Sequence, residues 1–336
     1  MWSSPTLAWW NTTSSRCCSV RSSEQKLRRY PFRAMGSRCQ IQLHAGRDAD
    51  AIVRAARDDI ERLEHKYSRF RSDSVVSHIN ASAGDAEGIE VDAETAALLD
   101  YADIGHRLSD GLFDVTSGVL RRAWDFRSNQ LPTQQEIEAL LPLVGWRKVV
   151  WERPRIALPR RGMQIDLGGY VKEYAADRVV QLCRGMGARH GFVDLGGDIA
   201  VIGPQPEGSP WRVGIRHPRA PQAAIAWVGL SSGAIASSGD YERFMLVDGV
   251  RYGHILDPTQ GWPVSGLAGV SVIAPQCVVA GTTSTIAMLK GEHAGRAWLA
   301  EVGLPHLSVD ARGRVSGTIA PETTGPLGAA APLIAG

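Results

Sequence analysis

The segment from residue 211 to residue 256 constrains the fold of this 336-residue chain more than any other part. It consists mostly of short β-like runs separated by glycine, serine, aspartate and proline. Runs separated by such turns are typical of antiparallel hairpins, in which strands that are neighbours along the chain pair with each other. A doubly wound sheet needs a helix between successive strands, which this pattern does not supply. We therefore expect antiparallel sheet in the second half of the chain.

Helices are expected mainly in the first half. Ile52, Ala56, Ile60 and Leu63 recur at helical spacing, with charged residues between them, which predicts a helix over 48–66. By the same reasoning, further helices are expected over 92–108, 133–141, 170–184 and 278–289. Strands are expected over 39–43, 147–152, 163–166, 191–194, 198–202 and 268–274. The fold class predicted from these patterns is mixed α/β (α+β), with helices early and antiparallel strands late.

A single domain is expected over residues 31–318, with folded structure beginning near Phe32. Residues 1–30 are expected to form a disordered leader. Residues 319–336 are rich in alanine, glycine and proline, and such a composition cannot bury enough apolar surface to order itself. We therefore expect a loose C-terminal tail there.

Composition excludes several classes of function. The net charge is only +2, and no dense block of lysine and arginine is interleaved with aromatic residues, so no nucleic-acid partner is expected. The five cysteines are odd in number and form no C-x-x-C pair, which indicates neither a disulfide framework nor a zinc site. The sequence contains no run of about 18 apolar residues, so no transmembrane helix is predicted.

The stretch 165–177 runs an apolar strand into a double-glycine turn and then into an amphipathic helix that opens with Lys172. The backbone N–H groups at a helix start already carry partial positive charge, so a lysine there is disfavoured by about 0.3–1 kcal/mol unless an anion lies nearby. An anionic ligand is one explanation. The other is a lysine that is solvated, or paired with Asp166 or Glu173.

Two further polar turns follow predicted strands. In the turn 237–243, small residues allow close approach of a ligand and Asp240 could accept hydrogen bonds from it, although a plain hairpin explains the pattern as well. In the turn 254–258, His254 could act as an acid, a base or a donor to an anion, or it could be a structural histidine.

Phe113 and Asp114 place an aromatic ring beside a carboxylate. This pairing suits a ligand with a flat ring, which the phenylalanine could stack on and whose polar edge could donate to the carboxylate. A helix cap next to a core phenylalanine is the alternative. The common nucleotide and hydrolase templates are missing, because the chain has no P-loop, no dinucleotide-binding G-x-G-x-x-G after its first strand, no H-E-x-x-H and no G-x-S-x-G.

These turns, in this order, resemble the ApbE family of flavin transferases over about residues 32–291. Members of that family cleave FAD and attach FMN to a threonine of a target protein, using magnesium, and their architecture is T-fold-like. The matching segments are Ala34-Met35-Gly36-Ser37, Ser68–Ser74 with Asn80, Gly111–Gly118, Asp166–Asp177, Asp194–Asp198, Ser238–Arg243 and His254–Pro258.

The resemblance also implies roles for individual residues. Its implied FAD-binding residues are Met35, Phe70 (where many relatives have tyrosine), Leu112, Phe113, Asp114, Asp166, Lys172 and His254. Lys172 and His254 would neutralise the pyrophosphate, and Asp166 or Asp257 would orient water or the acceptor threonine. The Gly169 carbonyl and the Thr285 hydroxyl would bind Mg²⁺.

The sequence departs from the family pattern at the metal site. Relatives carry an aspartate and, four residues later, a threonine at the start of the last helix, and both bind magnesium. Here Thr285 is kept, but Gly281 stands in the place of the aspartate. Because Mg²⁺ usually relies on one or two carboxylates, a site without this one should bind it weakly, unless Asp166 or Asp240 replaces it.

A second departure lies at the start of the helix predicted over 170–184. There Glu173 stands where many members have glycine, which adds a carboxylate.

The resemblance therefore implies an FAD:protein FMN transferase that uses FAD and Mg²⁺ and acts on an acceptor protein carrying a target threonine. A non-catalytic FAD-binding protein and an FAD pyrophosphatase are the alternatives, because of Gly281. The first 30 residues lack a continuous apolar region before a small-residue cleavage site, so a cytoplasmic location is expected. A periplasmic or inner-membrane lipoprotein is the alternative if the start codon is assigned wrongly. The sequence predicts no oligomeric state.

Overall fold

An antiparallel sheet of eight strands forms the centre of the computed structural model, which describes residues 26–44, 48–128 and 130–320. Every pair of neighbouring strands in it is antiparallel. In spatial order the strands are β1 (Leu27–Ala34), β2 (Ser37–His44), β6 (Gly191–Leu195), β7 (Asp198–Gly203), β10 (Ala234–Gly239), β13 (Leu267–Ala274), β14 (His306–Asp310) and β15 (Val315–Gly317). The expected mixed fold with antiparallel strands is confirmed.

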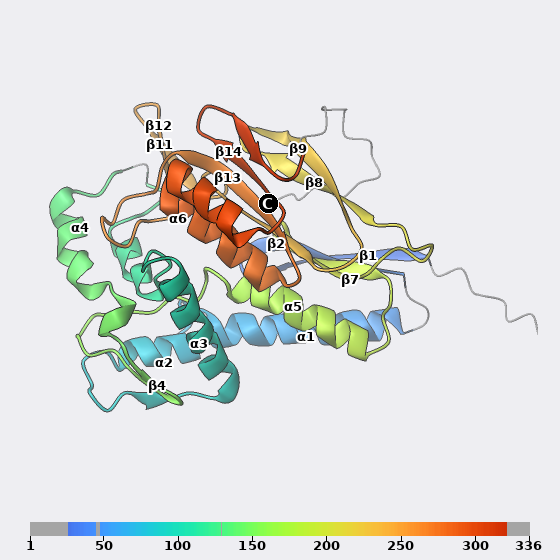
Figure 1. Cartoon of the computed structure of the whole chain (residues 1–336). Coiled ribbons are helices and arrows are strands. Elements are labelled where there is room, and N and C mark those ends of the chain that lie inside the picture. Colours follow the sequence, from blue (N-terminus) through green and yellow to red (C-terminus); the bar gives the residue numbers. More distant parts are fainter. Residues whose placement is uncertain (1–25, 45–47, 129, 321–336) are drawn as a thin grey trace, which may run out of the picture.

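The two faces of this sheet are covered differently (Figure 1). Helices α1 (Ala49–Tyr67), α5 (Val171–Gly185) and α6 (Cys277–Val302) belong to the core on one face, and the hairpin of β8 (Trp211–His217) and β9 (Ala220–Leu230) covers the other. Side chains alternate between the faces along each strand. In β10, for example, Ala234 and Ala236 belong to the helix-side core, and Ile235 belongs to the hairpin-side core. The small alanines let α6 lie close to the sheet.

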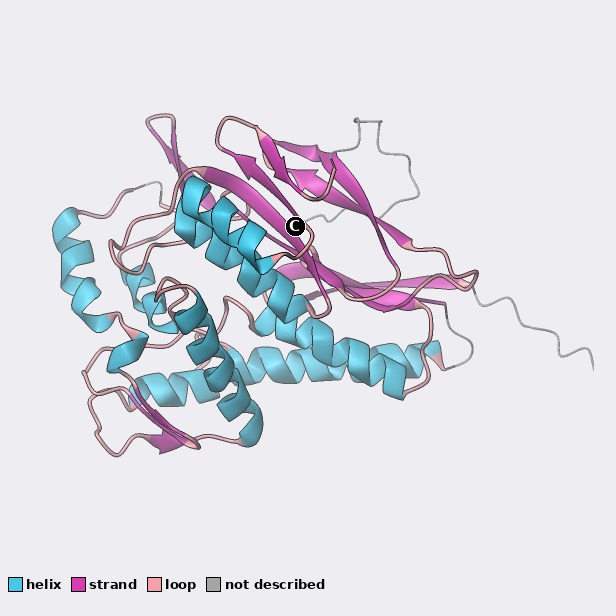
Figure 2. Ribbon diagram, viewed as in Figure 1, coloured by secondary structure: helices cyan, strands magenta, loops and turns pink. Residues whose placement is uncertain are grey.

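The remaining elements lie beside the sheet and are mostly helical (Figure 2). The helices there are α2 (Val75–Ala81), α3 (Ala93–Leu108), α4 (Gln134–Leu140) and the 3₁₀ helices η1 (Val115–Arg122), η2 (Leu141–Leu143) and η3 (Trp146–Lys148). The strands outside the large sheet are β3 (Ile89–Glu90), β4 (Val150–Glu152) and β5 (Arg155–Ala157), together with the hairpin of β11 (Phe244–Val247) and β12 (Val250–Gly253). No helix in the described part of the chain is long and apolar enough to cross a membrane.

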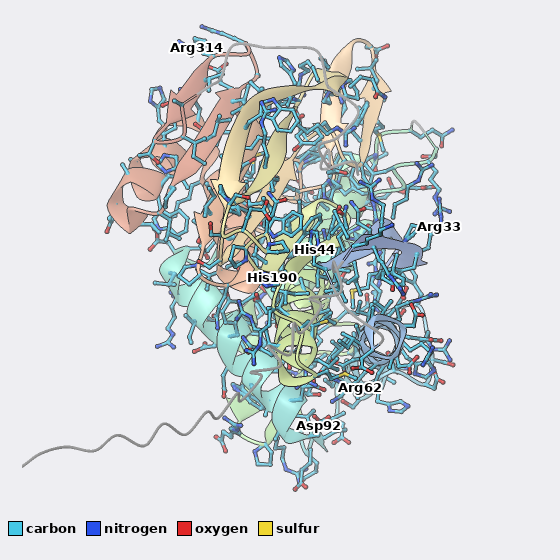
Figure 3. The ribbon with its side chains drawn as sticks, turned by 90° about the vertical axis from the view of Figure 1, so that its right-hand side faces the viewer. Arg33, His44, Arg62, Asp92, His190 and Arg314 are labelled. Atoms are coloured by element: carbon cyan, nitrogen blue, oxygen red, sulfur yellow. The ribbon has the colours of Figure 1, made fainter. Side chains whose placement is uncertain are left out.

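Capping side chains fix the starts of two of the expected helices. The Asp92 carboxylate accepts hydrogen bonds from the first free N–H groups of α3, and Thr133 forms a capping box with Glu136 at the start of α4. Ion pairs then tie α1 to α3, since Arg62 of α1 contacts Glu94 at 2.8 Å. Figure 3 shows Arg62 and Asp92 at the same end of the molecule.

The strand expected over 163–166 is wrong. The backbone of this segment pairs with a side chain: the Ile165 N–H donates to Asn80 Oδ1 at 2.7 Å, and Asn80 Nδ2 donates to the Ile165 carbonyl at 3.0 Å. The asparagine thus takes the place of a neighbouring strand. Pairing occurs instead over Arg155–Ala157, and the strand expected over 147–152 is reduced to Val150–Glu152 after a 3₁₀ turn.

Some boundaries also differ from expectation. The first strand begins at Leu27, before the expected start near Phe32. The last long helix extends to Val302, because Gly291 (φ 75°) kinks the chain and a second helical part follows. Of the expected leader and tail, residues 1–25 and 321–336 lie outside the described residues, as do Cys17 and Cys18.

Replacing Asn80 by alanine should destabilise the protein by about 2–3 kcal/mol, because it leaves the N–H and the carbonyl of buried Ile165 without partners. Urea unfolding measures this loss. Gln135→Ala is a matched control, since Gln135 is exposed on α4. An equal effect of both substitutions, within about 0.5 kcal/mol, would contradict the role given to Asn80.

Candidate active site

One cavity of about 570 Å³ gathers all the residues that the sequence predicted to bind FAD or the metal through the family resemblance. A cavity of this size suits a small-molecule ligand. The predicted residues among its lining are Met35, Phe70, Leu112, Phe113, Asp114, Asp166, Gly169, Lys172, His254 and Thr285. They come from segments that are far apart in the sequence, so the fold alone brings them together. Their individual roles stay predictions.

Met35 of the turn between β1 and β2 and Phe70 belong to the apolar part of the lining. Met35 and Gly36 both have positive φ (50° and 71°), as the tight two-residue turn of a hairpin requires. Phe70 is 84% exposed at the cavity, and its ring lies 4.6 Å from the guanidinium carbon of Arg69. An exposed aromatic ring at a cavity is suited to stacking against a flat ligand.

Phe113 and Asp114 serve the structure here, as the structural alternative expected. Phe113 is buried against Tyr170. Asp114 caps η1, and its carboxylate accepts hydrogen bonds from the Thr116 N–H at 2.8 Å and the Trp146 N–H at 2.7 Å. Both of its oxygens are therefore engaged by the protein.

Lys172 forms an ion pair with Asp198, which is buried at the start of β7. The ion-pair partner of this lysine is therefore Asp198, and not Asp166 or Glu173 as the sequence suggested. Burial by itself lowers the pKa of Lys172, but the charges of Asp198 and Glu173 outweigh burial and hold that pKa above its ordinary value. Asp198 also accepts a hydrogen bond from the Ser237 N–H at 3.2 Å. The pair links α5, β7 and β10 at the cavity wall.

Glu173 lines the same cavity, and its side chain is buried. Its Oε2 has no hydrogen-bond partner among the described residues. Burial, followed by the charge of Asp198, raises the pKa of Glu173 to about 8. The Glu173 side chain packs against Gly281 of α6, where α5 and α6 meet. The sequence singled out both positions but gave no sign that they meet.

Arginines gather around Asp166 on another wall of the cavity. The Asp166 carboxylate lies 3.5 Å from Nε of Arg69 and 4.0 Å from Nε of Arg121. Arg243 also lines the cavity, and burial lowers the pKa of Arg121, with further lowering from the charges of Arg69 and Arg243. One carboxylate thus faces several guanidinium groups, which leaves this wall with excess positive charge and able to bind an anion. Sequence reasoning did not assign a role to Arg121 or Arg243.

His254 follows β12 at the cavity wall, and its buried Nδ1 has no hydrogen-bond partner among the described residues. Burial, followed by the charges of Arg121 and Arg243, lowers the pKa of His254 to about 4. The imidazole is therefore neutral near pH 7. It can donate or accept one hydrogen bond, but in the free protein it brings no positive charge to an anion.

Two predicted carboxylates lie outside the cavity lining. Asp240 is held by Arg219 through contacts of 2.6 and 2.7 Å. Asp257 accepts hydrogen bonds from the N–H and the hydroxyl of Thr259, as ordinary turn chemistry requires. Neither residue lines the cavity, and the structure lends the roles expected for them no support.

Oxygen ligands for a hard cation are present but sparse. The Thr285 hydroxyl lies at the cavity 2.8 Å from Oγ of Ser238, and Gly169 lines the same cavity. No group of three or more His, Cys, Asp or Glu side chains in the described residues could hold a metal by itself. A cation here would need oxygens from a ligand as well, as Mg²⁺ commonly does.

A sequence profile of the ApbE family matches residues 35–308. The chain belongs to the ApbE family. It is 31% identical over 245 residues to the FAD:protein FMN transferase of Vibrio cholerae, covering 71% of this chain and 73% of the relative. The protein of the same name from Treponema pallidum is 31% identical over 290 residues, or 80% of each chain.

Solved structures agree with this assignment. The ApbE protein of Thermotoga maritima superimposes with a TM-score of 0.81 at 34% identity, over 87% of this chain and 97% of that one. The apo form of the flavinyl transferase ApbE of Pseudomonas stutzeri gives 0.78 at 28% identity, over 87% and 95%. The family and the fold expected from the motifs are thereby confirmed.

The imidazole of His254 should titrate with a midpoint near pH 4, so that it loses its proton well below neutrality. Arg243→Gln should raise the midpoint by removing a repelling charge, whereas Arg147→Gln, outside the cavity lining, should not change it. Inorganic pyrophosphate should also raise it, because an anion stabilises the imidazolium. NMR titration of the ring signals, assigned with His254→Gln, checks this, and a midpoint near the ordinary 6.5 would contradict it.

Proposed function

We propose that this chain is an FAD:protein FMN transferase. The observation that carries the proposal is the gathering of all the predicted flavin-site residues in one cavity. The cavity has an exposed aromatic ring for a flat ring system and arginines for linked phosphates. Relatives in the same family that are about 30% identical carry this name, which further supports the proposal.

In the proposed reaction, the hydroxyl oxygen of an acceptor threonine forms a bond to the FMN phosphorus of FAD. The P–O bond to the AMP moiety breaks, AMP leaves, and the hydroxyl proton is released. Arg121 and Arg243 would stabilise the charge on the pyrophosphate. Lys172 would assist from its pair with Asp198, and neutral His254 would donate a hydrogen bond. Asp166 would orient the acceptor hydroxyl, since Asp257 lies outside the cavity.

We further propose that the reaction uses Mg²⁺, held by the Gly169 carbonyl, the Thr285 hydroxyl and phosphate oxygens of the substrate. A bound Mg²⁺ would neutralise the negative charge that develops on the phosphates. The unpartnered buried oxygen of Glu173 in the same cavity supports a cation there.

The decisive test combines the purified chain, FAD, MgCl₂ and an acceptor protein that carries the family's threonine motif. Covalent flavin fluorescence of the acceptor in a denaturing gel, with one AMP released per label, is expected. Binding of FAD without AMP release would favour the flavin-binding alternative. AMP release without labelled protein would favour the pyrophosphatase alternative. Either result would overturn the transferase proposal.

Arg121→Gln should lower kcat/KM for FAD by about 10–100-fold, because it removes a charged donor aimed at the pyrophosphate. Arg122→Gln is the matched control. Arg122 is the next residue of η1, but its guanidinium donates to the Gly162 carbonyl at 3.1 Å at an exposed position. Steady-state rates of AMP release measure both variants, and an equal loss in both would speak against the arginine wall as the phosphate site.

A further inference from the structure

Glu173 and Gly281 come from different helices and meet at the wall of the cavity. A Cβ atom placed on Gly281 would lie 2.7 Å from Cγ of Glu173 and 2.9 Å from its Oε1. Side-chain carbons do not approach other atoms so closely. The Glu173 side chain therefore fills the space that a side chain at position 281 would need, and the two positions are tied together sterically.

Glu173 differs from the other acidic groups that the fold places in or near the cavity. Asp198 is paired with Lys172, Asp166 lies beside Arg69 and Arg121, and Asp240 is held outside the cavity by Arg219. Each of these three carboxylates forms an ion pair, whereas the nearest cation whose charge acts on Glu173, Lys172, is paired with Asp198. Glu173 is buried, and its Oε2 accepts no hydrogen bond from any described residue. A buried carboxylate oxygen without a partner is costly, which indicates that a ligand completes it.

Helix geometry places this carboxylate beside the hydroxyl assigned to the metal. Thr285 follows Gly281 by four residues in α6, so the two positions share one helix face. Because Glu173 packs on Gly281 and both Glu173 and Thr285 line the cavity, the carboxyl group lies within about one helical turn of the Thr285 hydroxyl.

We propose that Glu173 supplies the carboxylate ligand of the metal ion in this chain, in the place of the aspartate that relatives carry at the position of Gly281. The ligand has moved from α6 to the first turn of α5, and the glycine at 281 is what makes room for it. This inference rests on the proposed Mg²⁺-dependent function and names a residue of that same site. It replaces the expectation of a weakened site, and also the expectation that Asp166 or Asp240 substitutes.

Metal binding measured directly, without turnover, tests the proposal. Mn²⁺ is titrated into the full-length chain with and without FAD, and unbound Mn²⁺ is measured by electron paramagnetic resonance. Glu173→Gln keeps the shape but removes the charge, and it should weaken Mn²⁺ binding by at least about tenfold, the scale known even for indirect partners of metal ligands. Glu242→Gln is the control, because Glu242 lines the cavity but lies 3.5 Å from Arg216.

A pair of variants separates this role from a merely structural one. Gly281→Asp alone should not tighten Mn²⁺ binding and should lower Tm, because the new side chain collides with Glu173. The double variant Glu173→Gly/Gly281→Asp rebuilds the arrangement of the relatives, and it should recover Mn²⁺ affinity to within about threefold of the wild type. The double variant also keeps the test decisive if Glu173→Gln folds poorly.

Two outcomes would overturn the proposal: unchanged Mn²⁺ affinity in Glu173→Gln, or tighter binding in Gly281→Asp alone. Failure of the proposed function would look different. If the wild type labels no acceptor protein while Glu173→Gln loses Mn²⁺ affinity, the proposal for Glu173 as a metal ligand holds and the proposal of a transferase fails. If the wild type labels the acceptor protein and Glu173→Gln binds Mn²⁺ as tightly as the wild type, the proposal of a transferase holds and the proposal for Glu173 fails.

Discussion

The ion pair of Lys172 and Asp198 is the contact on which the architecture of the cavity depends. It joins the first turn of α5 to the start of β7, and the Ser237 N–H extends the link to β10. A buried charge is tolerated only when it is paired, so these elements can approach each other only with both partners in place. The turn between β6 and β7 supports the pair, because Gly196 and Gly197 have positive φ and bring the strand ends together.

More acidic groups than cations lie around this pair, and burial raises the pKa of two of them. Asp194 lies on the neighbouring strand, where Gln40 and the Gly197 N–H satisfy its oxygens and burial raises its pKa to about 6. Glu173 follows Lys172 in the first turn of α5, and burial raises its pKa to about 8. Near Asp166 cations outnumber acidic groups, since Arg69 and Arg121 face a single carboxylate. A substrate with linked phosphates and an accompanying cation matches this arrangement. The phosphates would face the arginines, and the cation would face the acidic groups.

The polar turns that follow strands or start helices pointed to parts of the cavity, because turn chemistry is local, and the resemblance to the ApbE family implied the rest of its lining. Sequence reasoning missed whatever depends on contacts between distant segments. Arg121 and Arg243 look like solvated arginines until the fold brings them beside His254. Asn80 was quoted as part of a motif, yet nothing local reveals that its amide pairs with the backbone of Ile165. An anion beside Lys172 was one of the alternatives, but Asp198 is 26 residues away, so the sequence could not identify it.

The two departures from the family pattern, Gly281 and Glu173, also depend on a contact between distant segments, which only the folded structure reveals. Taken separately, Gly281 reads as a lost ligand and Glu173 as a surplus charge. In the folded structure the two departures compensate each other, because the longer glutamate side chain extends from α5 into the space that a side chain at position 281 of α6 would occupy. The start of α5 is also a favourable place for that carboxylate, since the partial positive charge of a helix N-terminus stabilises an acidic residue in its first turn. A metal site is defined by where its oxygens lie, so a ligand can change helix while the site stays in place.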